Sequence, residues 1–313
     1  MNKTDKIFVA GHRGLVGSAV VKRLKELGYQ NITTKTSKEL DLTNQLHTRV
    51  FFSIETPDYV FDCAALVGGI HDNNTRRADF IYNNLMIQNN IIECCREFKV
   101  KKLLFLGSSC LYPRNCEQPI KEEYLLTGEL EQTNEPYAIS KIAGIKMCES
   151  YRRQYGCNFI SVMPTNIYGS SEDNYDLEKS HVFAAMIRKF HDAKVEGKKE
   201  VILWGDGSPM REFLFIDDLA DALVFLMQSY NSEEFLNIGT GIDISISNLA
   251  HKIKNVIGFE GEIKWDSNKP NGTPRKLLDV SRIHKLGWKH KTELDEGIRI
   301  TYDRFLNNKP RKL

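Results

Sequence analysis

The sequence contains no apolar run long enough to cross a membrane and no excess of charge of either sign. A membrane-spanning helix needs roughly 18 or more apolar residues, and no stretch of the 313 residues approaches that length. The 43 basic and 41 acidic residues leave a net charge of +2. Because this balance provides no general attraction for nucleic acid or an anionic membrane, we expect neither as a partner.

Paired cysteines and a secretion signal are missing as well. The seven cysteines form no CxxC pair and no zinc-like Cys/His spacing, which argues against disulfides and against a bound metal. The N-terminal stretch MNKTDKIFVAG has no signal-peptide core, and its short apolar run is typical of a first strand. These absences predict a soluble, cytoplasmic protein.

The sequence does contain an alternation of short apolar runs and helical patterns. KIFVA is followed by LVGSAVVKRLKELG, and DYVFDCA, KKLLFLG and FISVMP come later with helical patterns between them. Repeated β-α-β units with buried strands predict an α/β fold with a doubly wound parallel sheet, the Rossmann arrangement. Ligands of such sheets bind beyond the carboxyl ends of the strands.

Three glycines, Gly11, Gly14 and Gly17, lie between the first strand and the first helix. Glycines there allow a tight turn and let the backbone approach a pyrophosphate at the helix N-terminus. Alone they indicate only a turn, but their place in a β-α-β series favours dinucleotide binding. We expect residues 1–168 to form a dinucleotide-binding domain with returning segments at about 201–244. Residues 169–200 and 245–313 would then form a smaller, substrate-binding lobe.

The end of the second strand distinguishes NAD from NADP. NAD-binding proteins place an acid there, whereas NADP-binding proteins supply cations for the 2′-phosphate. The stretch TTKTSKELD offers Lys35 and Lys38 and no acid before Glu39, and Arg13 in the glycine loop is a further cation. Two lysines also suit a solvated surface, but the missing acid favours NADP(H).

A tyrosine and a lysine, Tyr137 and Lys141, are four residues apart in EPYAISKIAG. On a helix this spacing places both side chains on one face. A tyrosine with an ordinary pKa near ~10 is a poor acid or base at neutral pH, and a neighbouring ammonium is expected to lower that pKa. Ser108, in GSSCLYP after another strand, is suited to hold a carbonyl group. Together the three residues predict a carbonyl reductase.

With these motifs the chain resembles the extended short-chain dehydrogenases/reductases, which modify nucleotide sugars. PTNIYG, REFLFIDDLADAL, NIGTG and KLGW occur in the family's order. NEPYAISKIAGIKMCESY, SHV, PMREF and GTPRKLLDV are similar to the members that epimerise and reduce a GDP-4-keto-6-deoxy sugar. The resemblance covers most of the chain. It implies a GDP-sugar substrate, NADP(H), and a homodimer formed through the helices around 79–98 and 137–155.

The resemblance also gives a role to the cysteine in GSSCLYP. Cys110 matches the family's catalytic cysteine, and His181 in EKSHVF matches its catalytic histidine. Inverting C3 or C5 beside a 4-ketone needs a base on one face and an acid on the other. Thiols and imidazoles, with ordinary pKa values near ~8.5 and ~6.5, suit this task. We expect Cys110 as the base and His181 as the acid, although the sequence does not fix which is which. Reduction of C4 through Ser108, Tyr137 and Lys141 would follow.

Binding residues follow from the same resemblance. A diphosphate suits cations with forked geometry, so we expect it to meet Arg211 first and Lys189 second. Trp204 is expected to meet the guanine, and Asn271 matches a substrate contact in the family. A core tryptophan and a solvated lysine are the alternatives at Trp204 and Lys189. The cofactor is expected to contact Gly11, His12, Arg13, Gly14, Leu15, Val16, Gly17, Asp41, Leu42, Lys141, Pro164, Thr165, Asn166, Ile167 and His181. The other cysteines are expected to be packing residues: Cys63, Cys94, Cys95, Cys116, Cys148 and Cys157.

Other functions compete with this interpretation. A related 4,6-dehydratase or 4-epimerase would share the fold, but the dehydratases carry acidic residues after the serine and the 4-epimerases need no cysteine/histidine pair. A catalytically idle NADP-binding scaffold typically lacks the tyrosine or the lysine, and both are present here. The complete set of residues favours an active enzyme.

Overall fold

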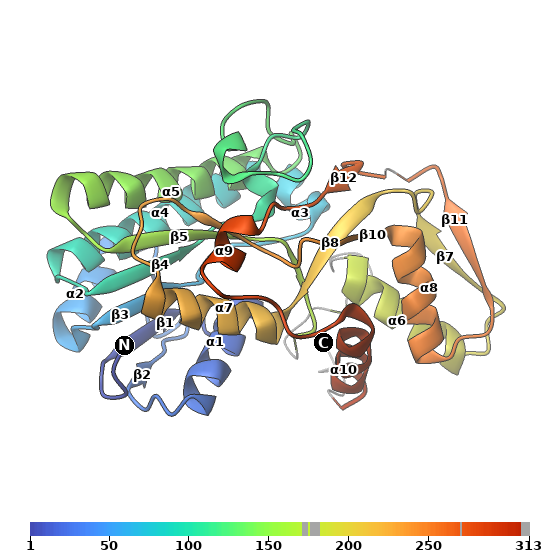
Figure 1. The fold of residues 1–313 in the computed structure, drawn as a ribbon, viewed down its shortest axis with the longest axis horizontal. Helices are drawn as coiled ribbons and strands as arrows, with labels where there is room; N and C mark the ends of the chain where they lie inside the picture. The colour runs from blue at the N-terminus through green and yellow to red at the C-terminus, as the bar shows by residue number, and fades with distance from the viewer. Residues whose placement is uncertain (171–174, 176–181, 270, 308–313) are drawn as a thin grey trace.

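A six-stranded parallel sheet forms the centre of the computed structural model, which describes residues 1–170, 175, 182–269 and 271–307. The strand order is β2-β1-β3-β4-β5-β9 (Figure 1). The strands are β1 Ile7–Ala10, β2 Ile32–Thr33, β3 Tyr59–Asp62, β4 Lys102–Leu106, β5 Phe159–Pro164 and β9 Leu236–Ile238. Because β2 and β3 lie on opposite sides of β1, the sheet reverses its order there. The predicted doubly wound α/β fold is confirmed.

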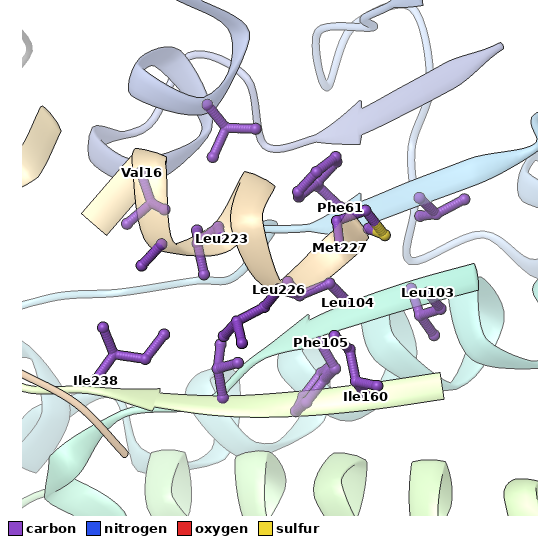
Figure 2. Packing of buried hydrophobic residues seen from close by; sticks show 14 of the residues in the cluster. Val16, Phe61, Leu103, Leu104, Phe105, Ile160, Leu223, Leu226, Met227 and Ile238 are labelled. Carbon is purple, nitrogen blue, oxygen red and sulfur yellow. The ribbon is translucent and has the colours of Figure 1, made fainter. Parts of the chain in front are cut away.

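Helices cover both faces of this sheet. On one face α1 and α7 pack against each other, and on the other α4 packs between α2 and α5. Figure 2 shows Leu223, Leu226 and Met227 of α7 among the core side chains of the strands. The helices and turns of this lobe are α1 Leu15–Glu26, α2 Gln45–Glu55, α3 Ile70–Thr75, α4 Arg77–Glu97, η1 Ser109–Leu111, η2 Glu122–Tyr124, α5 Glu135–Tyr155 and α7 Ile216–Ser229.

A smaller lobe surrounds a second hydrophobic core. Its central strand β8 pairs with β10 in antiparallel fashion and with β6 and β12 in parallel, while β7 and β11 form a two-stranded sheet. Helices α6, α8 and α10 pack beside these strands. The elements are β6 Asn166–Tyr168, α6 Val182–Val195, β7 Glu200–Trp204, β8 Met210–Phe215, β10 Asp243–Ser245, α8 Ile246–Ile257, β11 Glu262–Asp266, β12 Arg275–Lys276 and α10 Leu294–Asn307. None of the helices in the described ranges is both long and apolar enough to span a bilayer.

The division between the lobes differs from the expected one in two places. Within the expected return at about 201–244, α7 and β9 rejoin the main lobe, but β7 and β8 belong to the smaller sheets. β7 buries only every second residue, Val201 and Leu203, as a strand with one covered face does. Conversely, residues 278–288 return to the main core through α9 (Ser281–Lys285), where Ile283 and Trp288 are buried.

One row of side chains crosses the main sheet near its C-terminal edge. Ala10, Asp62, Phe105 and Ser161 are register partners along β1, β3, β4 and β5. Register partners in neighbouring strands point to the same face of a sheet. A Cβ on Gly144 of α5 would lie 2.3 Å from Cζ of the Phe105 ring, so this row faces the helix layer that contains α5.

Candidate active site

The glycine loop joins β1 to α1 at the C-terminal edge of the main sheet. Gly11 has a φ of 75°, and a Cβ there would lie 2.7 Å from the Cys63 carbonyl oxygen. A Cβ on Gly17 would lie 2.3 Å from the Gly11 carbonyl oxygen. Gly14 is the N-cap of α1 and has no side chain to occupy the N–H groups of the first turn. This close-packed backbone with a bare helix N-terminus fits a dinucleotide pyrophosphate.

The loop after β2 contains lysines and a carboxylate that is hydrogen-bonded by a neighbouring threonine. Glu39, the first acid after this strand, accepts hydrogen bonds from the hydroxyl and the N–H of Thr36 at 2.7 and 2.8 Å, and these bonds lower the pKa of its carboxyl. Because β2 is the parallel neighbour of β1, its end lies on the same side of the sheet as the glycine loop. Lys35 lies close enough to Glu39 to help lower its pKa, Lys38 follows in the same loop, and Arg13 belongs to the glycine loop.

Ser108 and Cys110 lie directly after β4. Ser108 is the N-cap of η1, and its Oγ accepts a hydrogen bond from the Cys110 N–H at 3.4 Å. The Cys110 thiol donates a second hydrogen bond to the same oxygen, with 3.2 Å between sulfur and oxygen. Both residues are half-buried, so a ligand at the sheet edge has access to the thiol and the hydroxyl together.

Tyr137 and Lys141 approach this turn from α5. Tyr137 is half-buried and close enough to Cys110 for their charges to interact. The Nζ of Lys141 lies 4.5 Å from the centroid of the Phe105 ring, and Lys141 is only 3% exposed. The structure therefore brings Cys110, Tyr137 and Lys141 together with Ser108. His181 lies outside the described residues.

Burial dominates the titration of both α5 residues. It raises the pKa of Tyr137, and the nearby Cys110 raises it further, so the expected net lowering of this pKa is wrong. That expectation came from the four-residue spacing along the helix, whereas the loss of water around the phenol group determines the direction of the pKa shift. Burial lowers the pKa of Lys141, and the charge of Asp62 is the first influence that opposes it. A tyrosine with a raised pKa keeps its proton at neutral pH, which is the form that donates to a carbonyl oxygen.

Lys189 and Trp204 meet on the smaller lobe. Trp204 on β7 is 56% exposed, so it is not a core residue. The Lys189 Nζ lies 5.8 Å from the tryptophan ring centroid and donates a hydrogen bond to the Ile202 carbonyl oxygen at 3.0 Å. Lys189 is thus bound to β7 rather than extended into solvent. Lys269 places a second ammonium 5.3 Å from the same ring.

Asn271 and Arg211 lie next to this aromatic surface. The Asn271 Oδ1 accepts the N–H of Asp206 at 2.9 Å, two residues beyond Trp204. A Cβ on Gly272 would lie 3.5 Å from an Arg211 guanidinium nitrogen. The residues predicted to hold the substrate's guanine and diphosphate therefore share one end of the smaller lobe.

Lys276 lies between the residues around Cys110 and those around Arg211, and the sequence did not predict it. It pairs with Arg211 in the ladder between β12 and β8, so both side chains point to one face. Burial lowers the pKa of Lys276, and the nearby Cys110 acts in the opposite direction. Lys276 and Cys110 also line one cavity of about 50 Å³. In the sequence, Lys276 stands in GTPRKLLDV without a spacing that relates it to Cys110.

The remaining predicted cofactor residues lie along the same edge of the sheet. At the passage from β5 to β6, the Thr165 N–H donates to the Ile238 carbonyl oxygen at 2.9 Å, and Asn166 Nδ2 donates to the Glu212 carbonyl oxygen at 2.8 Å. The Asp41 Oδ1 is occupied by the hydroxyl and N–H of Thr43 at 2.6 and 2.9 Å. Also at these strand ends are His12, Leu15 and Val16 after β1, Leu42 after β2, and Pro164 and Ile167 around β5 and β6.

Comparisons with known proteins agree with this geometry. The profile of the NAD dependent epimerase/dehydratase family matches residues 7–239. GDP-L-fucose synthase 1 of Arabidopsis thaliana is 57% identical over 307 residues, which cover 98% of this chain and 95% of that protein. The structure of a GDP-L-fucose synthetase from Naegleria fowleri bound to NADP is 30% identical, with a TM-score of 0.91 over 98% of this chain and 96% of that one. A GDP-6-OMe-4-keto-L-xylo-heptose reductase from C. jejuni is 42% identical, with a TM-score of 0.94 and 99% of both chains covered.

The fold and the site define a nicotinamide-dependent enzyme: a glycine loop follows β1, and a tyrosine and a lysine on α5 face a serine after β4. The chain belongs to the NAD dependent epimerase/dehydratase family.

Proposed function

We propose that this enzyme converts GDP-4-keto-6-deoxy-D-mannose to GDP-L-fucose with NADPH, by 3,5-epimerisation followed by reduction at C4. The observation that carries the proposal is the Cys110 thiol, held 3.2 Å from Ser108 Oγ beside Tyr137 and Lys141. Reduction uses the serine, the tyrosine and the lysine, whereas a thiol serves the breaking of a carbon–hydrogen bond. The 57% identity to a protein named GDP-L-fucose synthase 1 supports the same assignment.

The cofactor is assigned to the C-terminal edge of the main sheet. NADPH, when bound, supplies the hydride that reduces C4. The glycine loop would hold its pyrophosphate against the N-terminus of α1. Arg13, with Lys35 or Lys38, would hold the 2′-phosphate, and Thr36 engages one carboxylate oxygen of Glu39. The NADP-bound structure from Naegleria fowleri supports this choice of cofactor.

Epimerisation is assigned to Cys110 and His181. The Cys110 thiolate takes a proton from C3 or C5, and the electron pair of the broken bond forms an enolate whose oxygen is on C4. His181 donates a proton to the opposite face of that carbon, which restores the ketone with inverted configuration. Ser108 would hold the C4 oxygen throughout, and Lys276 places positive charge beside the sulfur. Once the Cys110 thiol has released its proton to solvent and His181 has taken one up, the pair serves the second carbon in the same way.

Reduction is assigned to Tyr137 and Lys141. Tyr137 donates its hydroxyl proton to the C4 oxygen as that oxygen becomes an alkoxide. Burial keeps the tyrosine protonated until then, because it raises the pKa of the hydroxyl. Lys141, one helical turn further along α5, carries the positive charge that stabilises the tyrosinate left behind.

Substrate binding is assigned to the adjoining end of the smaller lobe. Arg211 and Lys276 share one face of the β8–β12 ladder and suit the diphosphate. The exposed ring of Trp204, with Lys189 beside it, suits a guanine base. Asn271, whose side-chain amide is hydrogen-bonded to Asp206, is assigned to the same substrate-binding surface.

A second candidate is reduction of a GDP-linked 4-keto-heptose. The observation in its favour is the likeness to the C. jejuni reductase, at 42% identity over nearly the whole chain. The 57% identity to the Arabidopsis thaliana protein gives the fucose product precedence.

We further infer a homodimer and a cytoplasmic location. Helices α4 and α5 pack together and expose Tyr82 and Ile139, which are 63% and 43% exposed. These residues suit a bundle shared with a second copy, and sedimentation would give the mass of two chains. All seven cysteines are free thiols, which supports a reducing compartment.

The test is to mix the purified protein with NADPH and GDP-4-keto-6-deoxy-D-mannose, and to follow NADPH absorbance together with the identity of the product sugar. Formation of GDP-L-fucose with one NADPH oxidised per sugar is the expected result. Without NADPH oxidation the substrate assignment fails. A GDP-4-keto-heptose tested in parallel separates the second candidate, and NADPH binding without turnover of either sugar would indicate an idle scaffold.

A cysteine variant separates the two stages. Cys110→Ser is expected to lose epimerisation and still oxidise NADPH, so that the product keeps its original configuration at C3 and C5. Cys116→Ser is the matched control, because Cys116 is also half-buried but, among the described residues, makes no hydrogen bond to Ser108. GDP-L-fucose made by Cys110→Ser would contradict the role of the thiol.

A further inference from the structure

A buried carboxylate lies beneath the Tyr137–Lys141 pair, and the proposed mechanism gives it no task. Asp62 ends β3 and has no exposed surface. Its Oδ1 accepts the N–H of Ala64 at 3.2 Å, whereas its Oδ2 has no hydrogen-bond partner among the described residues. Buried carboxylates with incomplete hydrogen bonding are costly to a fold. Such a group needs an explanation in the chemistry around it.

The register of the sheet places Asp62 beside Lys141. Asp62 is the β3 partner of Phe105, so both side chains point to the face covered by α5, from backbones about 5 Å apart. The Lys141 Nζ lies 4.5 Å from the centroid of that Phe105 ring. Within the part of the chain that the structure describes, no residue accepts a hydrogen bond from this ammonium. A buried anion and a buried cation therefore adjoin one aromatic ring.

Besides Tyr137 one turn away on α5, the other ionisable groups that act on this pair are thiols. They come from each element packed here: Cys63 after β3, Cys95 on α4, Cys148 on α5 and, toward Lys141, Cys110 on η1. Burial raises the pKa of Cys63 and of Cys148 to about 12, and that of Cys95 well above its ordinary value. These three thiols stay neutral at physiological pH. Asp62 is the one carboxylate among the groups that act on Lys141.

We propose that Asp62 is a positioning residue that keeps the Lys141 ammonium charged and in place for the reduction step. The inference rests on the proposed function, because it concerns how the reductive half of that function is tuned. Burial alone would drive a proton off Lys141, and the carboxylate opposes this. Epimerisation through Cys110 does not use the ammonium, so the two halves of the reaction depend on Asp62 differently.

The first test uses Asp62→Asn, which keeps the shape and removes the charge. We expect kcat for NADPH oxidation to fall about tenfold, which is less than the 10²–10⁴-fold contribution of an acid–base group itself. KM for the sugar should change little. Solvent-deuterium exchange at C3 and C5 should continue at the wild-type rate, which also shows that the variant is folded. Burial raises the pKa of Asp62 to about 6, so wild-type reduction should lose activity below that pH, and Asp62→Asn should lack this dependence.

The second test measures Lys141 itself, in the protein without added substrate or cofactor. With lysine labelled at its ε-carbon, an NMR titration gives the pKa of Lys141, whose signal is assigned by its loss in Lys141→Arg. The pKa should be lower by a unit or more in Asp62→Asn than in wild type. An unchanged Lys141 pKa, or a wild-type kcat, in Asp62→Asn would overturn the proposal.

Controls separate this inference from the proposed function. Ser161→Ala changes the β5 partner of the same Phe105 without touching a charge, and both measurements should match wild type. If wild-type protein fails to oxidise NADPH with this sugar, the proposed function fails, while the Lys141 titration still decides on Asp62. If Asp62→Asn does not fold, Asp62→Ser removes the same charge with a smaller side chain.

Discussion

The main lobe buries a lysine at each end of β4, and the two ammonium groups are held in opposite ways. At the N-terminal end Lys102, which is 2% exposed, donates hydrogen bonds to three carbonyl oxygens at the end of α7 and to the Asn231 side chain. At the C-terminal end Lys141, which is 3% exposed, has no hydrogen-bond acceptor among the described residues and lies beside Asp62.

The difference separates a structural ammonium group from one that is assigned to the proposed reaction. Burial lowers the pKa of Lys102 to about 8, and four acceptors at a helix C-terminus compensate for the lost water. Lys141 and Asp62 lack such partners, and they lie at the edge of the sheet where ligands bind. The well-bonded Lys102 is therefore assigned to stability, whereas Lys141 with Asp62 is assigned to chemistry.

The largest effect is expected from Tyr137→Phe at the C-terminal end. Removing the hydroxyl should lower kcat for NADPH oxidation by about 10²–10⁴-fold, because the C4 oxygen loses its proton donor. Stability should hardly change. Tyr151→Phe is the control on the same helix, since the Tyr151 hydroxyl bonds to Glu93 near the surface. Equal losses in both variants would show that α5, rather than the hydroxyl, was damaged.

At the N-terminal end, Lys102→Met should cost about 3 kcal/mol of unfolding free energy, because it leaves buried acceptors without a donor. Activity per folded molecule should stay at the wild-type level. Lys101→Met is the matched control: Lys101 is exposed, and its ion pairs with Asp5 and Asp58 at 3.1 and 3.0 Å should be worth less than about 1 kcal/mol. Urea unfolding of the variants measures both numbers. Similar costs at the two positions would contradict the structural role of Lys102.

Asp62→Asn should change stability in a pH-dependent way. Burial raises the pKa of Asp62 to about 6, so between about pH 4 and pH 6 the folded protein holds a proton that the unfolded chain has lost. Wild-type stability therefore falls, relative to Asp62→Asn, as the pH rises through this window. The variant should gain about 2 kcal/mol on wild type between pH 4.5 and pH 7.5. A difference between the two proteins that is constant with pH would show that Asp62 does not titrate there.

The smallest effect is expected on the smaller lobe. Trp204→Ala should raise KM for the GDP-sugar about fivefold and leave kcat unchanged, because a stacking surface contributes to binding and not to the reaction. Ile202→Ala provides the control from the same exposed face of β7. A fall in kcat with an unchanged KM would remove Trp204 from the base-binding surface.

Local sequence patterns were sufficient to predict the main sheet and to indicate most of the residues that the structure gathers at the candidate site. The glycine loop, Ser108 and the Tyr137–Lys141 spacing each lie in one short segment, and parallel strands bring the ends of those segments to one edge. The expected return at about 201–244 began too early: β7 pairs with β11, and β8 pairs with β6, β10 and β12, because a strand pattern does not identify its partner strand.

Asp62 and Lys276 could not be predicted because their partners come from distant segments. Asp62 acquires its neighbours from the register of β3 with β4 and from the packing of α5. Lys276 meets Arg211 through the β12–β8 ladder. The direction of the Tyr137 pKa shift was missed for a related reason, because burial depends on tertiary packing and not on spacing along a helix.

One end of this sheet is assigned two separable reactions, proton exchange at Cys110 and reduction at Tyr137. The most direct measurement is the NMR spectrum of the sugar after reaction in D₂O with wild type and with Tyr137→Phe. Wild type with NADPH should yield GDP-L-fucose that carries deuterium at C3 and C5. Tyr137→Phe should exchange the same two positions while NADPH stays unoxidised. GDP-L-fucose without deuterium from wild type, or loss of exchange in Tyr137→Phe, would contradict the account.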